Sequence, residues 1–216
     1  TYQIITYYSI YLIGLSKNSL AETVVLTCAF CYNTCMQVDF YRGGAEAVII
    51  LTGLGGNTLG HDGKYAKIAE KLNKERNASI FVFATPENCW DNPAAVFENA
   101  VNCVYSQIKP EKIYVFGNSA GANLAICYSY LFPDIKKVVA VNPVLNLNID
   151  RTKNGVLNFK GENLLIAVGE KDSSRAFLPC VPQKRNVRTI TVAEADHLFT
   201  NMTDNFVQLS DQLFTE

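Results

Sequence analysis

One pentapeptide constrains the fold of this chain more than any other segment: residues 117–121 read Gly-Asn-Ser-Ala-Gly. The apolar residues 113–116 before it predict a buried strand, and residues 122–131 after it predict a helix. A strand that turns sharply into a helix brings its backbone against neighbouring elements, so a side chain at either flanking glycine is expected to clash. The turn would push Ser119 outward, which makes Ser119 a candidate nucleophile.

A serine hydroxyl is a weak nucleophile until an imidazole takes its proton, and that imidazole needs a carboxylate partner. The chain has only two histidines. His197 follows the β-branched residues 189–192, which predict a short strand, so His197 is placed in the loop beyond a strand end. We take His197 as the candidate base. His61 lies in a glycine-rich loop and is interpreted as structural, with a substrate-side role as the alternative.

The carboxylate is expected between the serine and the histidine, at the end of another strand. Residues 164–168 form a continuous apolar run, and Gly-Glu-Lys-Asp follows directly. Asp172 is our candidate acid. Glu170 is the alternative, because either carboxylate could orient the imidazole, whereas Asp196 adjoins His197 in the sequence and is expected to point elsewhere.

These three motifs make the chain resemble the α/β-hydrolase superfamily over about residues 45–216. The resemblance implies an α/β fold with a mostly parallel central sheet flanked by helices, and the order of Ser119, Asp172 and His197 agrees with it. It also implies a serine hydrolase that cleaves an ester or thioester through an acyl-enzyme.

The resemblance further implies an oxyanion hole of two backbone N–H groups. One comes from the residue after the nucleophile, here Ala120, and the other from a glycine-containing loop after the third strand. Residues 52–57 read Thr-Gly-Leu-Gly-Gly-Asn and follow an apolar strand, so Leu54 is the second candidate donor. Many relatives carry histidine where this chain has Thr52, and a plain flexible turn is the alternative interpretation.

The rest of the chain predicts strands that alternate with helices, as in a doubly wound sheet. The predicted helices cover residues 63–75, a segment that starts at Asp91-Asn92-Pro93, and residues 205–214. Further strands are predicted at residues 80–83 and 138–141.

Two expectations concern the segments after residues 117–121, the turn that we call the elbow. The helix there is expected to bury Tyr128 and Leu131 and to stop at Pro133. The interval from Asn142 to Asn163 has too few residues for a lid of several helices, so we expect no substantial lid domain and an open site.

Length and composition predict one domain over residues 1–216, since 216 residues with 49% hydrophobic content can bury a single large core. Residues 1–43 are predicted to hold N-terminal edge strands. Residues 1–16 carry no charge but are shorter than the roughly 20 residues of a spanning helix, and no basic run opens them as in a signal peptide. A processed or anchored terminus is the other interpretation.

Net charge and cysteine content limit the classes of partner and cofactor that we expect. A net charge of −1 with interspersed signs disfavours nucleic acid and anionic membranes. Cys28, Cys31 and Cys35 match no common metal pattern, so we expect no metal, no cofactor, and buried thiols in a cytoplasmic protein. The expected partner is a small-molecule acyl ester or thioester.

Two classes of function remain open at this point. A serine hydrolase is the first, and an amidase, peptidase or acyltransferase would use the same groups. A non-catalytic binding protein that keeps the fold is the second. Neither the substrate nor the oligomeric state follows from the sequence.

Overall fold

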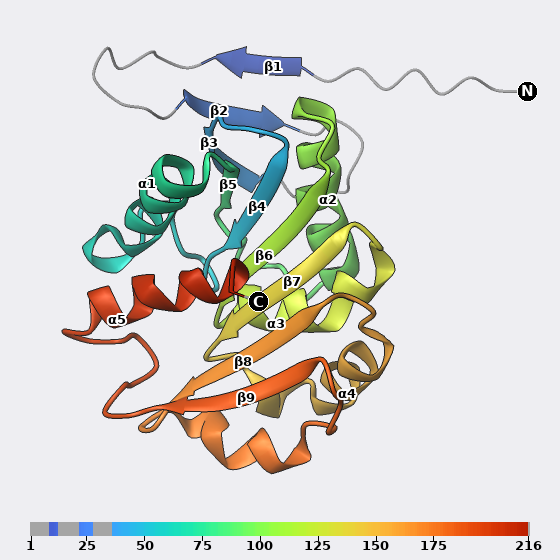
Figure 1. Ribbon diagram of the computed structural model, residues 1–216, viewed down its shortest axis with the longest axis vertical. Coiled ribbons are helices and arrows are strands. Elements are labelled where there is room, and N and C mark those ends of the chain that lie inside the picture. The colour runs from blue at the N-terminus through green and yellow to red at the C-terminus, as the bar shows by residue number, and fades with distance from the viewer. Residues whose placement is uncertain (1–8, 13–21, 28–35, 216) are drawn as a thin grey trace, which may run out of the picture.

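The computed structural model describes residues 9–12, 22–27 and 36–215, and these contain nine strands that form one sheet in the order β1-β2-β3-β5-β4-β6-β7-β8-β9 (Figure 1). The strands are β1 (Ser9–Leu12), β2 (Glu22–Thr27), β3 (Met36–Tyr41), β4 (Glu46–Leu51), β5 (Ser79–Phe83), β6 (Lys112–Asn118), β7 (Ile135–Val141), β8 (Asn163–Gly169) and β9 (Val187–Val192).

The strands run in two patterns. From β5 through β4 to β9 every neighbouring pair is parallel, whereas β1, β2, β3 and β5 pair antiparallel. The prediction of a mostly parallel sheet is confirmed, and β1 to β3 lie at one edge. Parallel strands that are neighbours in a sheet end at the same edge, so the segments after β4, β6, β7, β8 and β9 gather there.

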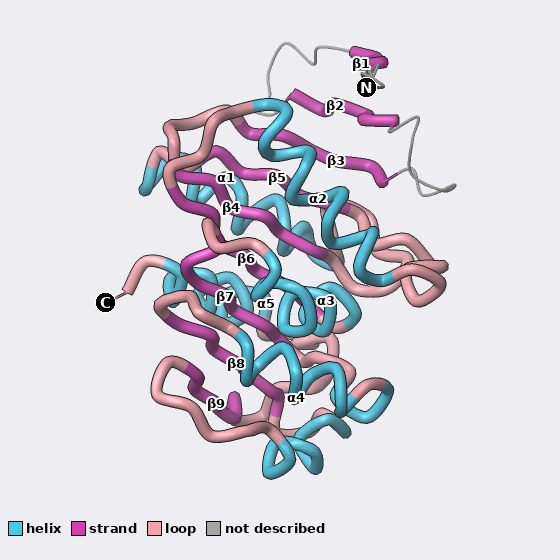
Figure 2. Tube along the Cα trace, turned by 90° about the vertical axis from the view of Figure 1, so that its right-hand side faces the viewer, coloured by secondary structure: helices cyan, strands magenta, loops and turns pink. Residues whose placement is uncertain are grey.

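Helices cover both faces of the sheet. Behind the sheet in Figure 2 lie α1 (Lys64–Arg76) and α5 (Thr203–Gln208), and in front of it lie α2 (Pro93–Gln107), α3 (Ala120–Tyr128) and α4 (Ile149–Asn158). Short 3-10 segments complete the chain: η1 (His61–Gly63), η2 (Ser129–Leu131), η3 (Leu145–Leu147), η4 (Ser173–Cys180) and η5 (Leu209–Leu213). The predicted helices at residues 63–75, after Pro93 and at residues 205–214 are confirmed within a few residues.

Strand β4 shows why the sheet needs both helix layers. Its side chains alternate between two cores, with Ile49 and Leu51 packed under α2 and α3, and Val48 and Ile50 packed under α1. All four are 0% exposed. Fully burying such a side chain stabilises the fold by about 1.5–3 kcal/mol, so a strand with apolar residues on both faces is stable only when both faces are covered.

The start of α2 follows from its sequence. The Asn92 side chain caps the helix by accepting a hydrogen bond from the Ala95 amide at 3.3 Å, and Pro93 occupies the first turn. Proline costs nothing there, because the first amides of a helix have no partner within the helix.

The end of α3 differs from the prediction. The helix stops at Tyr128, and Leu131, in the 3-10 turn η2, is 52% exposed rather than buried. A 3-10 turn has three residues per turn instead of 3.6, so it rotates the following side chains away from the buried face.

The segment from Asn142 to Asn163 forms η3 and α4 and carries no lid. Helix α4 packs closely on α3, and a Cβ at Gly155 would lie 2.1 Å from the Ile126 carbonyl oxygen. Val156 is fully buried in the core. The interval therefore belongs to the helix layer of the sheet.

Candidate active site

The elbow after β6 has the strained geometry that the sequence predicts. Ser119 takes φ 54° and ψ −116°, a left-handed conformation that is uncommon for any residue other than glycine. A Cβ at Gly117 would lie 2.6 Å from the Cα of Ala122, and one at Gly121 would lie 2.5 Å from the Leu51 carbonyl. The two glycines let β4 and α3 approach the turn, and Ser119 stays partly exposed.

The structure brings Ser119, Asp172 and His197 together at the carboxyl edge of the sheet. The Nε2 atom of His197 lies 3.0 Å from Oγ of Ser119, and its Nδ1 atom lies 2.5 Å from Oδ2 of Asp172. An ionised carboxylate accepts the Nδ1 hydrogen, which leaves Nε2 unprotonated and able to accept the serine hydroxyl hydrogen. This arrangement can draw a proton from Ser119.

Both oxygens of the Asp172 carboxylate have partners. Oδ2 contacts His197, and Oδ1 accepts the Ser174 amide hydrogen at 2.7 Å where η4 begins. The side chain is 0% exposed. Burial by itself raises the pKa of Asp172, but the hydrogen bonds from His197 and Ser174 outweigh it, so the pKa lies below its ordinary value. Asp172 is therefore held as a carboxylate beside the imidazole.

The other candidate side chains lie elsewhere. Glu170 accepts the Glu194 amide hydrogen at 3.0 Å and stabilises the turn before His197. Asp196 accepts the amides of Leu198 and Thr200, at 3.0 and 2.9 Å, within its own loop. Neither carboxylate reaches the imidazole in this conformation.

His61 lies in η1 and is well exposed, and its partner is the neighbouring Asp62, with Nε2 and Oδ2 3.5 Å apart. It makes no contact with the three side chains at the elbow among the interactions of the described residues.

The glycine loop after β4 lies beside the elbow, because Leu51 pairs with Gly117 in the sheet. The Gly121 amide donates to the Thr52 carbonyl at 3.1 Å. A Cβ at Gly53 would lie 3.5 Å from the Cβ of Ser119. The loop is thus close enough to the serine for a backbone N–H to reach a group bound there.

Thr52 fixes the start of this loop through the neighbouring strand end. Its Oγ1 accepts the Thr85 amide hydrogen at 2.9 Å, and the Thr85 hydroxyl donates to the Thr52 carbonyl at 2.8 Å. Both residues are buried.

In the described part of the chain, the amides of Leu54 and Ala120 donate to no other residue, so both can donate to a bound group.

Tyr65, near the start of α1, lies on the face of that helix that packs in the core, and it also makes polar contacts in this region. It is 3% exposed and packs on the ring of Phe206, yet its hydroxyl accepts the Gly53 amide at 3.3 Å and the Asn118 side-chain amide at 2.9 Å. Burial raises the pKa of Tyr65, so the phenol stays protonated at neutral pH. Tyr65 joins the glycine loop to the elbow, a role that only the tertiary contacts reveal.

Lys64, the first residue of α1, contacts the loop that carries His197. Its Nζ atom lies 4.2 Å from the ring centroid of Phe206 and donates to the Leu198 carbonyl at 3.4 Å. The residue is 4% exposed. Burial lowers the pKa of Lys64, and the nearby carboxylates of Asp196 and Asp62 oppose that shift.

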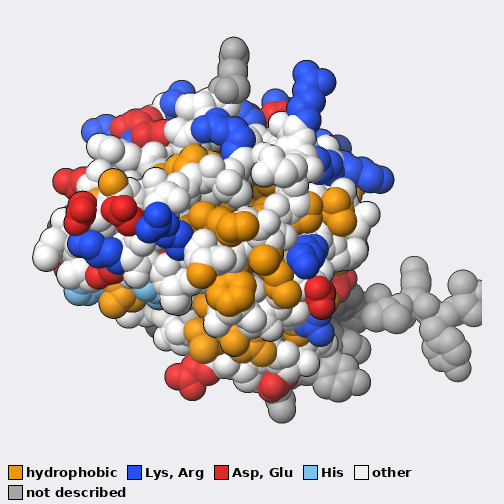
Figure 3. All heavy atoms as spheres, turned by 90° about the horizontal axis from the view of Figure 1, so that it is seen from below, with side chains coloured by type: hydrophobic (Ala, Val, Ile, Leu, Met, Phe, Trp, Pro, Cys, Tyr) orange, Lys and Arg blue, Asp and Glu red, His pale blue; other side chains and the backbone are white. Residues whose placement is uncertain are grey.

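The surface around the site is open and in part apolar. Leu54 is 50% exposed, Leu59 57% and Leu198 57%, and each belongs to a loop that borders the elbow. Figure 3 shows that apolar side chains also gather in patches elsewhere, on the face seen from below.

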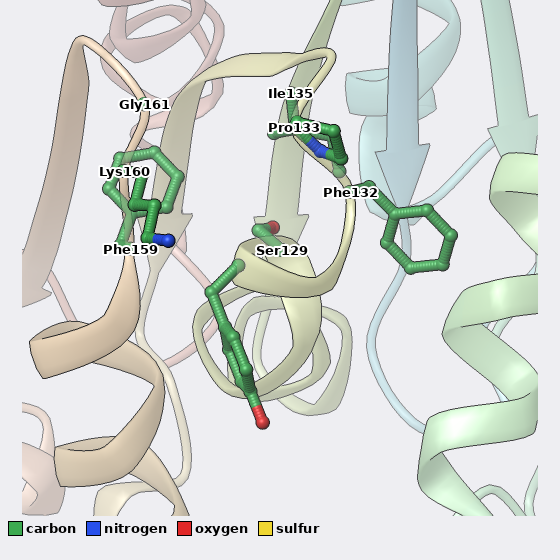
Figure 4. Close-up of a pocket in the computed structure, with 8 residues that line it drawn as sticks. Ser129, Phe132, Pro133, Ile135, Phe159, Lys160 and Gly161 are labelled. Atoms are coloured by element: carbon green, nitrogen blue, oxygen red, sulfur yellow. The ribbon is translucent and has the colours of Figure 1, made fainter.

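A cavity of about 440 Å³ lies far from this edge. Its lining comes from the segment between α3 and β7 and from the segment before β8, which are amino ends of strands (Figure 4). Ser119, Asp172 and His197 all follow carboxyl ends, so the cavity and the candidate site lie at opposite edges of the sheet.

Potential metal ligands do not cluster in the part of the chain that the structure describes. No group of three or more His, Cys, Asp or Glu side chains is placed to hold a metal ion there. Cys28, Cys31 and Cys35 lie outside the described residues. Burial raises the pKa of the Cys89 and Cys127 thiols to about 11 in each case.

Within the described ranges, none of the helices has the length and apolar character needed to cross a membrane. Cys180 is exposed, so the prediction of buried thiols is wrong for this residue. It lies at the end of η4, a surface 3-10 segment with a single buried residue, Ser174.

Known proteins resemble this chain in structure rather than in sequence. No protein-family model matches it, and no curated protein does. Est1E from Butyrivibrio proteoclasticus matches with a TM-score of 0.66 at 13% identity, over 85% of this chain and 95% of its own. A dienelactone hydrolase from Anabaena variabilis gives 0.63 at 16% identity, over 96% of this chain and 97% of its own.

An alpha-beta serine hydrolase homologue from Coxiella burnetii covers 100% of both chains with a TM-score of 0.64 at 15% identity. Together these likenesses show that the chain has the α/β-hydrolase fold, with a mostly parallel sheet and no large lid.

Proposed function

We propose that this chain is a serine hydrolase that cleaves an ester or thioester through an acyl-enzyme on Ser119. The observation that carries the proposal is the continuous set of hydrogen bonds from Asp172 through His197 to Ser119, at a strained elbow. Fold alone does not imply activity. The support comes from three chemically matched side chains, drawn from three loops, at hydrogen-bonding distances from one another.

The reaction has two halves. In the first, Oγ of Ser119 attacks the acyl carbon while Nε2 of His197 takes its proton, and a tetrahedral oxyanion forms. The imidazolium then gives that proton to the leaving alcohol or thiol, and the acyl group stays on the serine. In the second half, His197 takes a proton from water as the water oxygen attacks the acyl carbon. The imidazolium then returns that proton to Oγ of Ser119 as the bond between the acyl carbon and Oγ breaks, and the acid is released.

The amides of Leu54 and Ala120 are the proposed donors to the oxyanion. In related chemistry the loss of one such donor costs about 2.7–4 kcal/mol. The nearness of Gly53 to Ser119 supports this placement. Asp172 stabilises the imidazolium and fixes which ring nitrogen carries the hydrogen.

The proposed substrates are esters with short, water-soluble acyl groups. Helix α4 packs in the helix layer, and the residues that the structure describes form no large lid to enclose a long acyl chain over Ser119. Each methylene left in water forgoes about 0.8 kcal/mol of burial free energy. A long acyl chain would therefore gain little over an acetyl or butyryl group.

A series of p-nitrophenyl esters tests the proposal. We expect hydrolysis of the acetate and butyrate without an oil–water interface, a burst of nitrophenol, and an acyl adduct on the Ser119 peptide in mass spectra. The specificity constant should fall from butyrate to decanoate. A folded protein that hydrolyses none of these esters or their thioester analogues would contradict the proposal and favour a non-catalytic binding protein.

A further inference from the structure

Asn142 lies where the segments that carry the three candidate catalytic residues meet. It follows β7 directly, is 0% exposed, and takes φ 47°. This left-handed conformation is one that asparagine adopts more readily than most other residues. Val141, the residue before it, accepts the Ser119 amide hydrogen at 2.9 Å.

The side chain of Asn142 joins the loop of the acid to the loop of the base. Its Oδ1 accepts the Gly169 amide hydrogen at 2.7 Å, at the end of the strand that leads to Asp172. Its Nδ2 donates to the carbonyls of Asp196 and His197, each at 3.0 Å. One buried amide thus spans the carboxyl ends of three neighbouring strands.

Only an amide of this length satisfies all three partners. An aspartate in its place would present a second oxygen to the two carbonyls, and an apolar side chain would leave the Gly169 amide without an acceptor. Leaving a buried polar group unpaired costs about 1–3 kcal/mol. The loops also pack tightly here, since a Cβ at Gly169 would lie 2.5 Å from the Ala195 carbonyl.

We propose that Asn142 is a positioning residue that holds the His197 backbone so that the imidazole reaches Asp172 and Ser119 together. The inference rests on the proposed hydrolase function. The hydrogen bonds of the Asn142 side chain go to backbone groups and not to Oγ of Ser119 or the imidazole ring of His197. It acts through the carbonyl of His197 and through the strand end before Asp172, and a displacement of about 1 Å at reacting groups can cost about 100-fold in rate.

The chain supplies a matched control in Asn73 of α1. Its Nδ2 also donates to two backbone carbonyls, those of Arg42 and Ala78, each at 2.9 Å. Asn73→Asp removes the same kind of bridge between two segments at a distance from Ser119. Asn142→Asp removes the bridge at the site, and Asn142→Gly removes it while tolerating the positive φ.

The readouts are kcat, KM and the downfield proton resonance of the His197 to Asp172 hydrogen bond. Both Asn142 variants should lose about 10- to 100-fold in kcat with little change in KM, and the resonance should broaden or vanish. Asn73→Asp should lower the Tm but keep both kcat and the resonance. Wild-type kcat with an unchanged resonance in the folded Asn142 variants would overturn the proposal.

The wild-type protein provides a measurement that needs no variant. The two side-chain amide hydrogens of Asn142 should exchange slowly and shift when His197 is protonated, and fast exchange with no shift would overturn the proposal. If wild-type protein hydrolyses no ester, the proposed function fails, whereas the coupling between Asn142 and His197 still stands or falls on this titration.

Discussion

The two sides of Ser119 are built by different means. On the side of β7, β8 and β9, side chains hold the site, since Asp172 contacts His197 and Asn142 ties their loops together. On the side of β4 and β5, the glycine loop offers backbone N–H groups, and the contacts of Thr52 and Tyr65 hold it in place. One side presents functional side chains, and the other presents backbone N–H groups.

This difference decides what a substitution can do. A side chain on the first side can be removed in one step, whereas the amides on the second side persist in any residue except proline. We therefore expect large losses of activity from the acid and base, and smaller losses from the residues that shape the glycine loop.

The largest effect is expected from Asp172→Asn, which should lower kcat by about 10⁴-fold, because an amide can favour the wrong imidazole tautomer. Glu170→Gln is the matched control and should retain nearly full activity, since its side-chain oxygen can still accept the Glu194 amide. Steady-state kinetics on p-nitrophenyl acetate measures both. A greater loss in Glu170→Gln would transfer the role of the acid to Glu170.

Asp172 should also affect how the stability of the fold depends on pH in acid. Its pKa is lowered in the folded protein, so it contributes stability above its ordinary pKa of 3.8, and this contribution is lost as the pH falls through the lowered value. Urea unfolding of wild type and Asp172→Asn across pH 2–6, roughly two units either side of ordinary carboxyl values, should show a weaker acid dependence in the variant. Parallel curves would show that the carboxylate gains nothing from His197.

An intermediate effect is expected from Thr52→Val, which removes the acceptor of the buried Thr85 amide while keeping the shape of the side chain. The unfolding free energy should fall by about 1–3 kcal/mol, and kcat should fall by roughly 10-fold because the proposed oxyanion donors would be held less firmly. Thr152→Val, which removes another buried hydroxyl that accepts a side-chain amide, is the control. Equal losses of activity in both would separate the glycine loop from catalysis.

The smallest effect is expected from Lys64→Met, which removes the contact with the Leu198 carbonyl and leaves the bridge of Asn142 intact. We expect a change of kcat within a few-fold. Because burial lowers the pKa of Lys64, the unfolded chain binds more protons between that value and 10.5, and wild-type stability should gain with pH there. Lys64→Met should lack this gain, and a large loss of kcat instead would show that Lys64 shares the positioning of His197.

Much of this architecture could be predicted from the sequence because its signals are local. Apolar runs predict the strands, and Asn92-Pro93 predicts the start of α2. Because the chain has only two histidines, His197 is readily identified as the candidate base. The prediction that Leu131 is buried is wrong because a 3-10 turn follows α3. A leucine side chain does not distinguish a 3-10 turn from one more turn of α-helix.

The supporting residues could not be found in this way. Tyr65 fits a core stripe, and its hydroxyl gains meaning only when Gly53 and Asn118 fold against it. An asparagine after a strand, such as Asn142, is ordinary in any sequence, and its bridge depends on loops that lie 27 and 55 positions away in the chain. The Leu54 amide is predicted as an oxyanion donor only through the resemblance of residues 52–57 to a glycine loop, because a backbone N–H leaves no mark on residue type.

The most direct test of the central claim is covalent labelling of Ser119 by a fluorophosphonate probe, followed by peptide mapping. Wild-type protein should carry one label, on the elbow peptide, and Ser119→Ala should carry none. His197→Ala, which keeps the hydroxyl but removes the proton acceptor, should label slower by several orders of magnitude. Labelling that persists in a folded Ser119→Ala protein, or that proceeds at the wild-type rate in His197→Ala, would contradict an activated serine at this site.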